Sequence, residues 1–121
     1  MSDDLREVAP LIFDHECTLE GLGDDPELLA EMAGIFLEDI DGLVGQVREA
    51  VTSRDATALR ASAHQLKGSA SNFHAGRTTE VDLRLEMIGK QDELEGTDEV
   101  FENLVNEVER LKPELGKLAE C

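Results

Sequence analysis

Apolar side chains recur at three- and four-residue steps along four stretches of the chain, the spacing of one face of an α-helix. The first stripe comprises Leu28, Met32, Ile35, Phe36, Ile40, Leu43, Val47 and Val51. It follows Asp25 and Pro26, a pair that suits a helix start because aspartate caps the backbone and proline fits the first turn. A long helix is therefore predicted from residue 26.

The second stripe follows another capping residue, Asp55, and comprises Leu59, Ala63, Leu66, Ala70 and Phe73. A break from His74 to Gly76 separates it from the third stripe. That stripe has Val81, Leu85 and Ile88 on one face, with Leu83 and Met87 beside it. The pattern predicts two helices joined by a short turn.

The polar run from Gly89 to Gly96 predicts a loop, and Thr97-Asp98-Glu99 predicts a cap with an acidic first turn. The last stripe then comprises Phe101, Leu104, Val108, Leu111, Leu115 and Leu118. Pro113 lies within this stripe and predicts a kink or an early end of the helix. The same stripe could form a dimer seam, but the bundle itself needs that face, and a monomer is expected.

Ahead of the four stripes, Asp14 is predicted to cap a short helix that ends at Gly21-Leu22-Gly23. Residues 1–12, broken by Pro10, are predicted to be a loosely docked leader, and residues 13–121 a single domain. The sequence has no alternating strand pattern, repeat or low-complexity tract. The predicted fold is all-α, an antiparallel up-down-up-down four-helix bundle with a short extra N-terminal helix.

Charge and composition narrow the possible partners. The 121 residues carry a net charge of −17, which disfavours nucleic acid and anionic membranes. Aromatic residues make up only 3%, without Trp or Tyr, so platforms for stacking bases are lacking. Hydrophobic residues make up 40%, too many for a disordered acidic tail.

The cytoplasm is the expected location. No segment has the run of about 18 apolar residues that a membrane span needs. The acidic start of the chain is unlike a secretory signal, and Cys17 and Cys121 cannot form a disulfide framework. The pair His15 and Cys17 is more typical of surface and packing positions than of a metal site, so no metal is expected.

One segment departs from the acidic character of the chain. Ala56 to Thr79 contains none of the 28 acidic residues but does contain Arg60, Lys67 and Arg77. On a helical wheel His64 lies about 140° from Leu59 in the core, so it is predicted to point to solvent. Arg60 and Lys67 lie about one turn on either side of it.

Gly68 is unusual at an exposed position of this helix, because glycine in a helix interior costs about 1 kcal/mol relative to alanine. It shares the exposed face with three other small residues, Thr57, Ala61 and Ser71. An exposed imidazole with two cations and cleared neighbours suits a transient anion on His64. Each feature alone has an ordinary explanation: a surface histidine, a solvated lysine, or a glycine that permits close helix packing. Glu80, Asp82 and Glu86 are predicted to belong to a solvated face.

The segment Ala63-His64-Gln65-Leu66-Lys67-Gly68-Ser69-Ala70 resembles the A-H-x-L-K-G-[SA]-[SA] signature of histidine-containing phosphotransfer (HPt) domains. The similarity continues through Asn72, Phe73, Ala75, Leu85, Glu86 and Gly89. Two positions depart from the family pattern, which usually has glycine in place of His74 and often an aliphatic residue in place of Thr78.

The resemblance implies a phosphorelay intermediate. His64 would accept a phosphoryl group, through its outer nitrogen, from an aspartyl-phosphate on one receiver domain and pass it to an aspartate on another. Lys67 and Arg60 would favour the neutral imidazole and then stabilise the phosphoryl group. Gly68, Ala61, Ser71 and Thr57 would form the clearance and docking face.

The implied partners are response-regulator receiver domains, with a hybrid histidine kinase as a further candidate. Mg²⁺ is expected only in the receiver, and no cofactor is expected in this chain. No nucleotide-binding loop is present, so the chain is expected to have no catalytic turnover of its own. Two alternatives remain: an adaptor or inhibitor that binds a receiver or kinase without transfer, and a phosphoacceptor domain that a separate kinase phosphorylates in trans.

Overall fold

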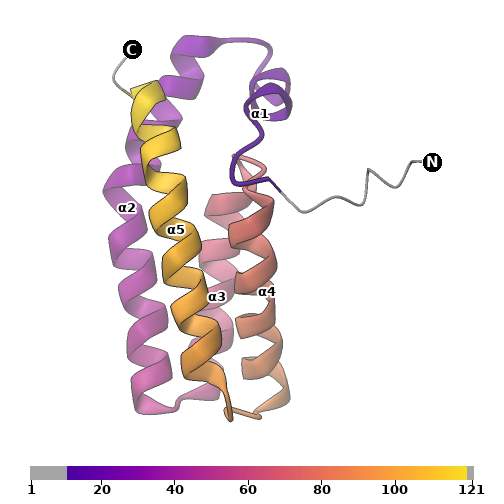
Figure 1. Cartoon of the computed structure of the whole chain (residues 1–121), viewed down its shortest axis with the longest axis vertical. Coiled ribbons are helices and arrows are strands. Elements are labelled where there is room, and N and C mark those ends of the chain that lie inside the picture. The colour runs from indigo at the N-terminus through magenta and orange to yellow at the C-terminus, as the bar shows by residue number, and fades with distance from the viewer. Residues whose placement is uncertain (1–10, 120–121) are drawn as a thin grey trace, which may run out of the picture.

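Four long helices and one short helix make up the part of the chain that the structure describes (Figure 1). The structure is a computed structural model, and it describes residues 11–119. The helices are α1 (His15–Gly21), α2 (Pro26–Ser53), α3 (Ala56–Ser71), α4 (Gly76–Gln91) and α5 (Thr97–Ala119). Residues 11–119 contain no strand, so the predicted all-α class is confirmed.

The long helices α2 to α5 form the bundle, and α1 lies at the end where α3 meets α4 (Figure 1). Helix α2 packs against α3 and α5, and α4 packs against the same two helices. Consecutive long helices are joined by short turns and therefore run in opposite directions. Most of the predicted leader, residues 1–10, lies outside the described part of the chain.

Aspartates start the first three helices, as predicted. The carboxylate of Asp14 accepts a hydrogen bond from the backbone N–H of Cys17. Asp25 accepts from two N–H groups of the first turn of α2, and Asp55 accepts from that of Ala58. These caps satisfy donors that have no partner within the helix, and so set where each helix begins.

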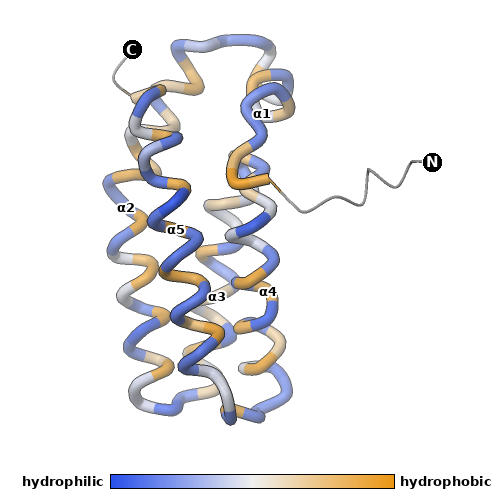
Figure 2. The backbone as a smooth tube through the Cα atoms, in the orientation of Figure 1, coloured by the Kyte–Doolittle hydropathy of each residue, from blue (hydrophilic) through white to orange (hydrophobic). Residues whose placement is uncertain are grey.

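The core consists of the apolar stripes turned toward the bundle axis, and Figure 2 shows the hydrophobic positions recurring along each helix. All five predicted core positions of the second stripe, on α3 and just after it, are buried, namely Leu59, Ala63, Leu66, Ala70 and Phe73. The prediction is wrong in the first turns of α2, where Leu28 and Ile35 are exposed. Leu29 and Ala33 are buried there instead, so the buried stripe at the start of α2 is shifted by one position from the predicted stripe.

Two helix ends also differ from the prediction. Helix α5 continues through Pro113 to Ala119, so of the two predicted effects of this proline, a kink or an early end, the early end is wrong. Gly89 is not in a loop but is buried within α4, which continues to Gln91. A Cβ atom at Gly89 would lie 2.7 Å from the backbone nitrogen of Arg60 and 2.8 Å from the carbonyl oxygen of Ala56. Glycine at this position thus lets α4 approach the backbone of α3.

Candidate functional site

His64 lies on the outer face of α3, as predicted, with 69% of its side chain exposed. Its Nδ1 atom is 3.0 Å from Oε2 of Glu86 on α4. The other carboxylate oxygen of Glu86, Oε1, is 2.8 Å from Nζ of Lys67, one turn along α3 from the histidine. One carboxylate therefore contacts both of the side chains that the sequence singled out.

Glu86 is ionised in this arrangement. Its side chain is only 16% exposed. The hydrogen bond from Lys67 is the largest of the effects that lower the pKa of Glu86, burial opposes it, and the bond to His64 adds to it. An ionised carboxylate can only accept hydrogen bonds, so Nδ1 of His64 keeps its proton and donates a hydrogen bond to Glu86. The lone pair of the neutral ring is then on Nε2.

The prediction that Asp82 and Glu86 belong to a solvated face is wrong, although Glu80 is indeed exposed. No carboxylate is near His64 along the sequence, but α4 brings Glu86 to it from 22 positions away. The sequence did carry one signal that Glu86 belongs to the site, because Glu86 is among the positions at which the chain resembles HPt domains. Asp82, one turn before Glu86, is completely buried.

The remaining predicted site residues fall on or near the same surface. Arg60, Thr57 and Ala61 line a shallow hollow together with His64 and Glu86. Ser71 is exposed and donates its hydroxyl hydrogen bond to the carbonyl of Lys67. A Cβ atom at Gly68 would meet no atom within 4 Å, so the fold itself does not require glycine there.

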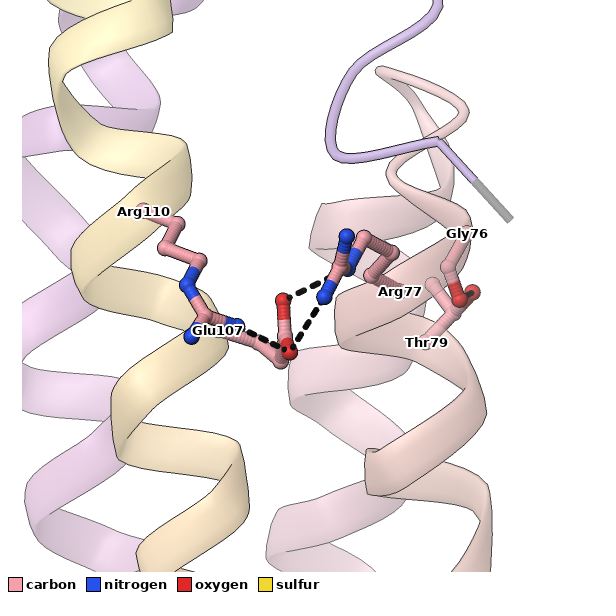
Figure 3. Close-up of polar contacts among 5 residues, drawn as sticks. All are labelled: Gly76, Arg77, Thr79, Glu107 and Arg110. Carbon is pink, nitrogen blue, oxygen red and sulfur yellow. Dashed lines mark hydrogen bonds and ion pairs between the residues drawn. The ribbon is translucent and has the colours of Figure 1, made fainter. Parts of the chain in front are cut away.

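Arg77, the third cation of the acid-free segment, belongs to the scaffold. Its Nε and Nη2 atoms donate to the carboxylate of Glu107 on α5, at 3.1 and 3.4 Å (Figure 3). Glu107 also accepts a 2.7 Å hydrogen bond from Nη1 of Arg110. Arg77 thus ties the start of α4 to α5.

The two departures from the family pattern have structural consequences. His74, in the turn between α3 and α4, has a φ of 49°, in the left-handed region that favours glycine. Thr78 is buried in α4, and its hydroxyl has no hydrogen-bond partner. The position of Thr78 therefore buries a polar atom where the family often has an aliphatic side chain.

An apolar groove on the other flank of α3 was not predicted. Between α2 and α3 it is lined by Met32, Ile35, Phe36, Asp39, Ser69, Asn72 and Phe73. Ile35 is exposed within it because the stripe of α2 is rotated from the predicted one. The groove and His64 thus lie on opposite flanks of one helix.

No group of three or more His, Cys, Asp or Glu side chains among residues 11–119 is arranged to hold a metal ion. Within the same range, no helix is both long and apolar enough to cross a membrane.

Fold and site together define a class of protein: an antiparallel helical bundle that presents one exposed histidine, flanked by a lysine, from the middle of a helix. The family model described as Hpt domain matches residues 31–114, which include His64, Lys67 and Glu86. The chain belongs to the Hpt domain family.

A solved structure supports the fold. The chain is similar to the crystal structure of histidine-containing phosphotransfer protein B (HptB) from Pseudomonas aeruginosa PAO1, with a TM-score of 0.83 and 20% sequence identity. The match covers 90% of this chain and 95% of that one. The comparison with curated proteins finds no match.

Proposed function

We propose that this protein is a phosphorelay intermediate in which His64 carries the phosphoryl group between two receiver domains. The observation that carries the proposal is the contact between Nδ1 of His64 and the ionised carboxylate of Glu86. When the ring is neutral, this contact leaves Nε2 as the exposed nucleophile. A surface histidine without a role would need neither this contact nor the lysine beside it.

In the transfer step, the Nε2 lone pair attacks the phosphorus of a receiver aspartyl-phosphate. A phosphorus–nitrogen bond forms while the bond from phosphorus to the acyl oxygen breaks, and the receiver carboxylate leaves with that electron pair. The ring keeps its Nδ1 proton, held by Glu86. The reverse reaction with the aspartate of a second receiver passes the group on.

The chain's own contribution is positioning and charge stabilisation, which are the main demands of phosphoryl transfer. Lys67 is one turn from His64, and its ammonium can move from Glu86 to a phosphoryl oxygen. Arg60, across the hollow, adds positive charge. The Mg²⁺ of the reaction belongs to the receiver, and this chain is proposed to need no cofactor of its own and to have no turnover alone.

The docking surface is proposed to be the face of α3 around His64, where Thr57, Ala61, Gly68 and Ser71 are exposed. Small side chains let a receiver bring its aspartate close to the ring. A monomer in the cytoplasm suits a carrier that must meet two receivers, and a hybrid histidine kinase is a further candidate partner.

The test is to mix the protein with a receiver domain that has been phosphorylated by acetyl phosphate in the presence of Mg²⁺. Wild type should acquire phosphate that is stable to alkali and labile to acid, and His64→Gln should acquire none. His15→Gln, at another exposed histidine, is the matched control and should be labelled like wild type. Circular dichroism should show equal helix content in all three proteins.

Two other outcomes would contradict transfer between receivers. Wild type that binds receivers but stays unlabelled with a panel of them would be an adaptor. Wild type labelled only by a kinase with ATP, and unable to pass the group to any receiver, would be a phosphoacceptor domain of that kinase.

A further inference from the structure

A second carboxyl group lies beneath the site. Asp82 is one helical turn before Glu86 on α4, its exposure is 0%, and neither of its oxygens has a hydrogen-bond partner. In residues 11–119, buried side-chain oxygens without a hydrogen bond occur only at Thr78, Asp82 and Glu86, at successive turns of α4. Of these, Oε1 of Glu86 is ion-paired with Lys67 at 2.8 Å.

The surroundings of Asp82 keep it protonated at neutral pH. Burial, and then the negative charge of Glu86, raise the pKa of Asp82 to about 8, while Lys67 opposes the rise. Among the helices of residues 11–119, α4 packs against α3 and α5, and the backbone N–H of Arg77 at its start donates to the carbonyl of Leu11. From α3 the nearby charged group is Lys67, with His64 and Arg60 at the surface above.

Of the charged groups in residues 11–119, those that act on the pKa of Asp82 are Glu86 and Lys67, and neither lies on α5. On α5, Glu107 is bound by Arg77 and Arg110. Arg77 in turn lies about 140° around α4 from Asp82. Lys67 is therefore the cation that Asp82 would attract on losing its proton.

We propose that Asp82 is a positioning residue for phosphoryl transfer: its neutral carboxyl group leaves the Lys67 ammonium directed outward to Glu86 and His64, and its ionisation draws Lys67 inward. The proposal rests on the proposed function. During transfer the Lys67 ammonium must leave the Glu86 carboxylate and move to the phosphoryl group. An ionised Asp82 beneath Lys67 would add a second attraction that opposes this outward movement.

The first test is the pH dependence of transfer from a receiver charged with acetyl phosphate, between pH 6.5 and 9. With a pKa of about 8, Asp82 is neutral in about nine-tenths of molecules at pH 7 and in about one-tenth at pH 9. If only the neutral form leaves Lys67 available, the wild-type rate falls up to about tenfold over this range relative to Asp82→Asn. The use of one receiver in all assays cancels its own pH dependence.

Thr78→Val is the matched control, because it removes the other buried unpartnered group of the same stripe without changing a titratable residue. Its pH profile should follow that of wild type. If wild type, Asp82→Asn and Thr78→Val are all labelled and their pH profiles superimpose, the role of Asp82 is overturned and the proposed function stands. No label on wild type at any pH would overturn the proposed function and, with it, any role of Asp82 in transfer.

A second measurement needs no transfer. In the unphosphorylated protein, NMR should show the Asp82 carboxyl carbon titrating well above pH 7, and Nζ of Lys67 shifting with the same midpoint. In Asp82→Asn the Lys67 transition should disappear. An Asp82 midpoint near 4, or a Lys67 signal that does not respond to Asp82, would overturn the proposal.

Discussion

At the scale of single residues, the site depends on one carboxylate that holds two neighbours in place. Glu86 accepts from Nδ1 of His64 through one oxygen and pairs with Lys67 through the other. The contact selects the tautomer of the imidazole, and the ion pair keeps the ammonium within reach of the ring. Neither effect requires Glu86 to touch the phosphoryl group.

Glu86→Gln should therefore slow transfer while His64 remains in place. An amide has one acceptor oxygen, and its NH₂ group only donates, so it cannot present a separate acceptor atom to each of His64 and Lys67 as the carboxylate does. We expect a transfer rate about tenfold lower, because losing about 1.4 kcal/mol, close to the net value of one hydrogen bond to a charged group, changes a rate by about that factor. Nitrogen-15 NMR of the imidazole should show a mixture of tautomers in place of the Nδ1–H form. Glu80→Gln, at an exposed residue of the same helix, should match wild type. A variant with the wild-type rate and tautomer would contradict the role given to Glu86.

The buried hydroxyl of Thr78 predicts a stabilising substitution. Thr78→Val keeps the shape and removes a polar atom that has no partner, so the free energy of unfolding should rise by about 1 kcal/mol. Urea denaturation would measure the change. Thr79→Val is the control, because its hydroxyl donates to the carbonyl of Gly76, and no gain is expected there. A loss of stability in Thr78→Val would show that the hydroxyl has a partner after all.

At the scale of elements, the register between α3 and α4 decides the geometry of the site. Gly89 lies against the backbone of α3 at Ala56 and Arg60, less than one turn beyond Glu86. The close approach at this point holds the helix that carries Glu86 against the helix that carries His64. At the other end, Arg77 ties α4 to Glu107 of α5 (Figure 3).

Gly89→Ala should disturb both stability and function. The added methyl group would lie 2.7 Å from a backbone nitrogen, so the helices must move apart. We expect a loss of about 1–3 kcal/mol in the free energy of unfolding, as for other overpacked positions. Transfer should slow because Glu86 moves with α4.

Gly42→Ala is the matched control for this prediction. Gly42 is exposed in α2, and a Cβ atom there would meet nothing within 4 Å. The better helix propensity of alanine should raise stability by up to about 1 kcal/mol. Equal effects of the two substitutions in thermal melts would rule out the close approach at Gly89 as the cause.

At the scale of the whole molecule, two effects make stability fall as the pH rises. The net charge of −17 produces self-repulsion that grows as remaining protons are lost. Asp82 acts in the same direction, since its pKa is raised from 3.8 to about 8 on folding. Its stabilising contribution is fully present below the unfolded value and is lost as the pH rises through the folded one. Glu86, with a lowered pKa, acts oppositely, and its contribution is lost as the pH falls.

We therefore expect the melting temperature to be highest at mildly acidic pH and to decline toward pH 9. Asp82→Asn should flatten the decline between pH 5 and 9, and its advantage over wild type should be largest at the alkaline end. Added salt screens the repulsion between surface charges but not the cost of burying Asp82, so the difference between the two proteins should persist at high salt. Parallel pH curves for wild type and variant would contradict the burial of an ionisable Asp82.

The sequence by itself determined what depends on local spacing. Helix starts at Asp14, Asp25 and Asp55 were predictable because a cap needs only its own first turn. The outward direction of His64 was predictable because helical geometry sets it relative to Leu59. The motif around His64 and Lys67 was likewise a matter of neighbours along one helix.

Only the tertiary structure decided what depends on the contact between helices. Glu86 and Asp82 lie on one stripe of α4, and the sequence does not show which flank of α4 the helix α3 covers. Packing places Glu86 beside His64 and buries Asp82. The same holds for Gly89, whose place in a helix or a loop depends on how closely α3 approaches. A carboxylate absent from the histidine's own stretch of chain can therefore still be its nearest partner, because distance along the sequence does not limit distance between packed helices.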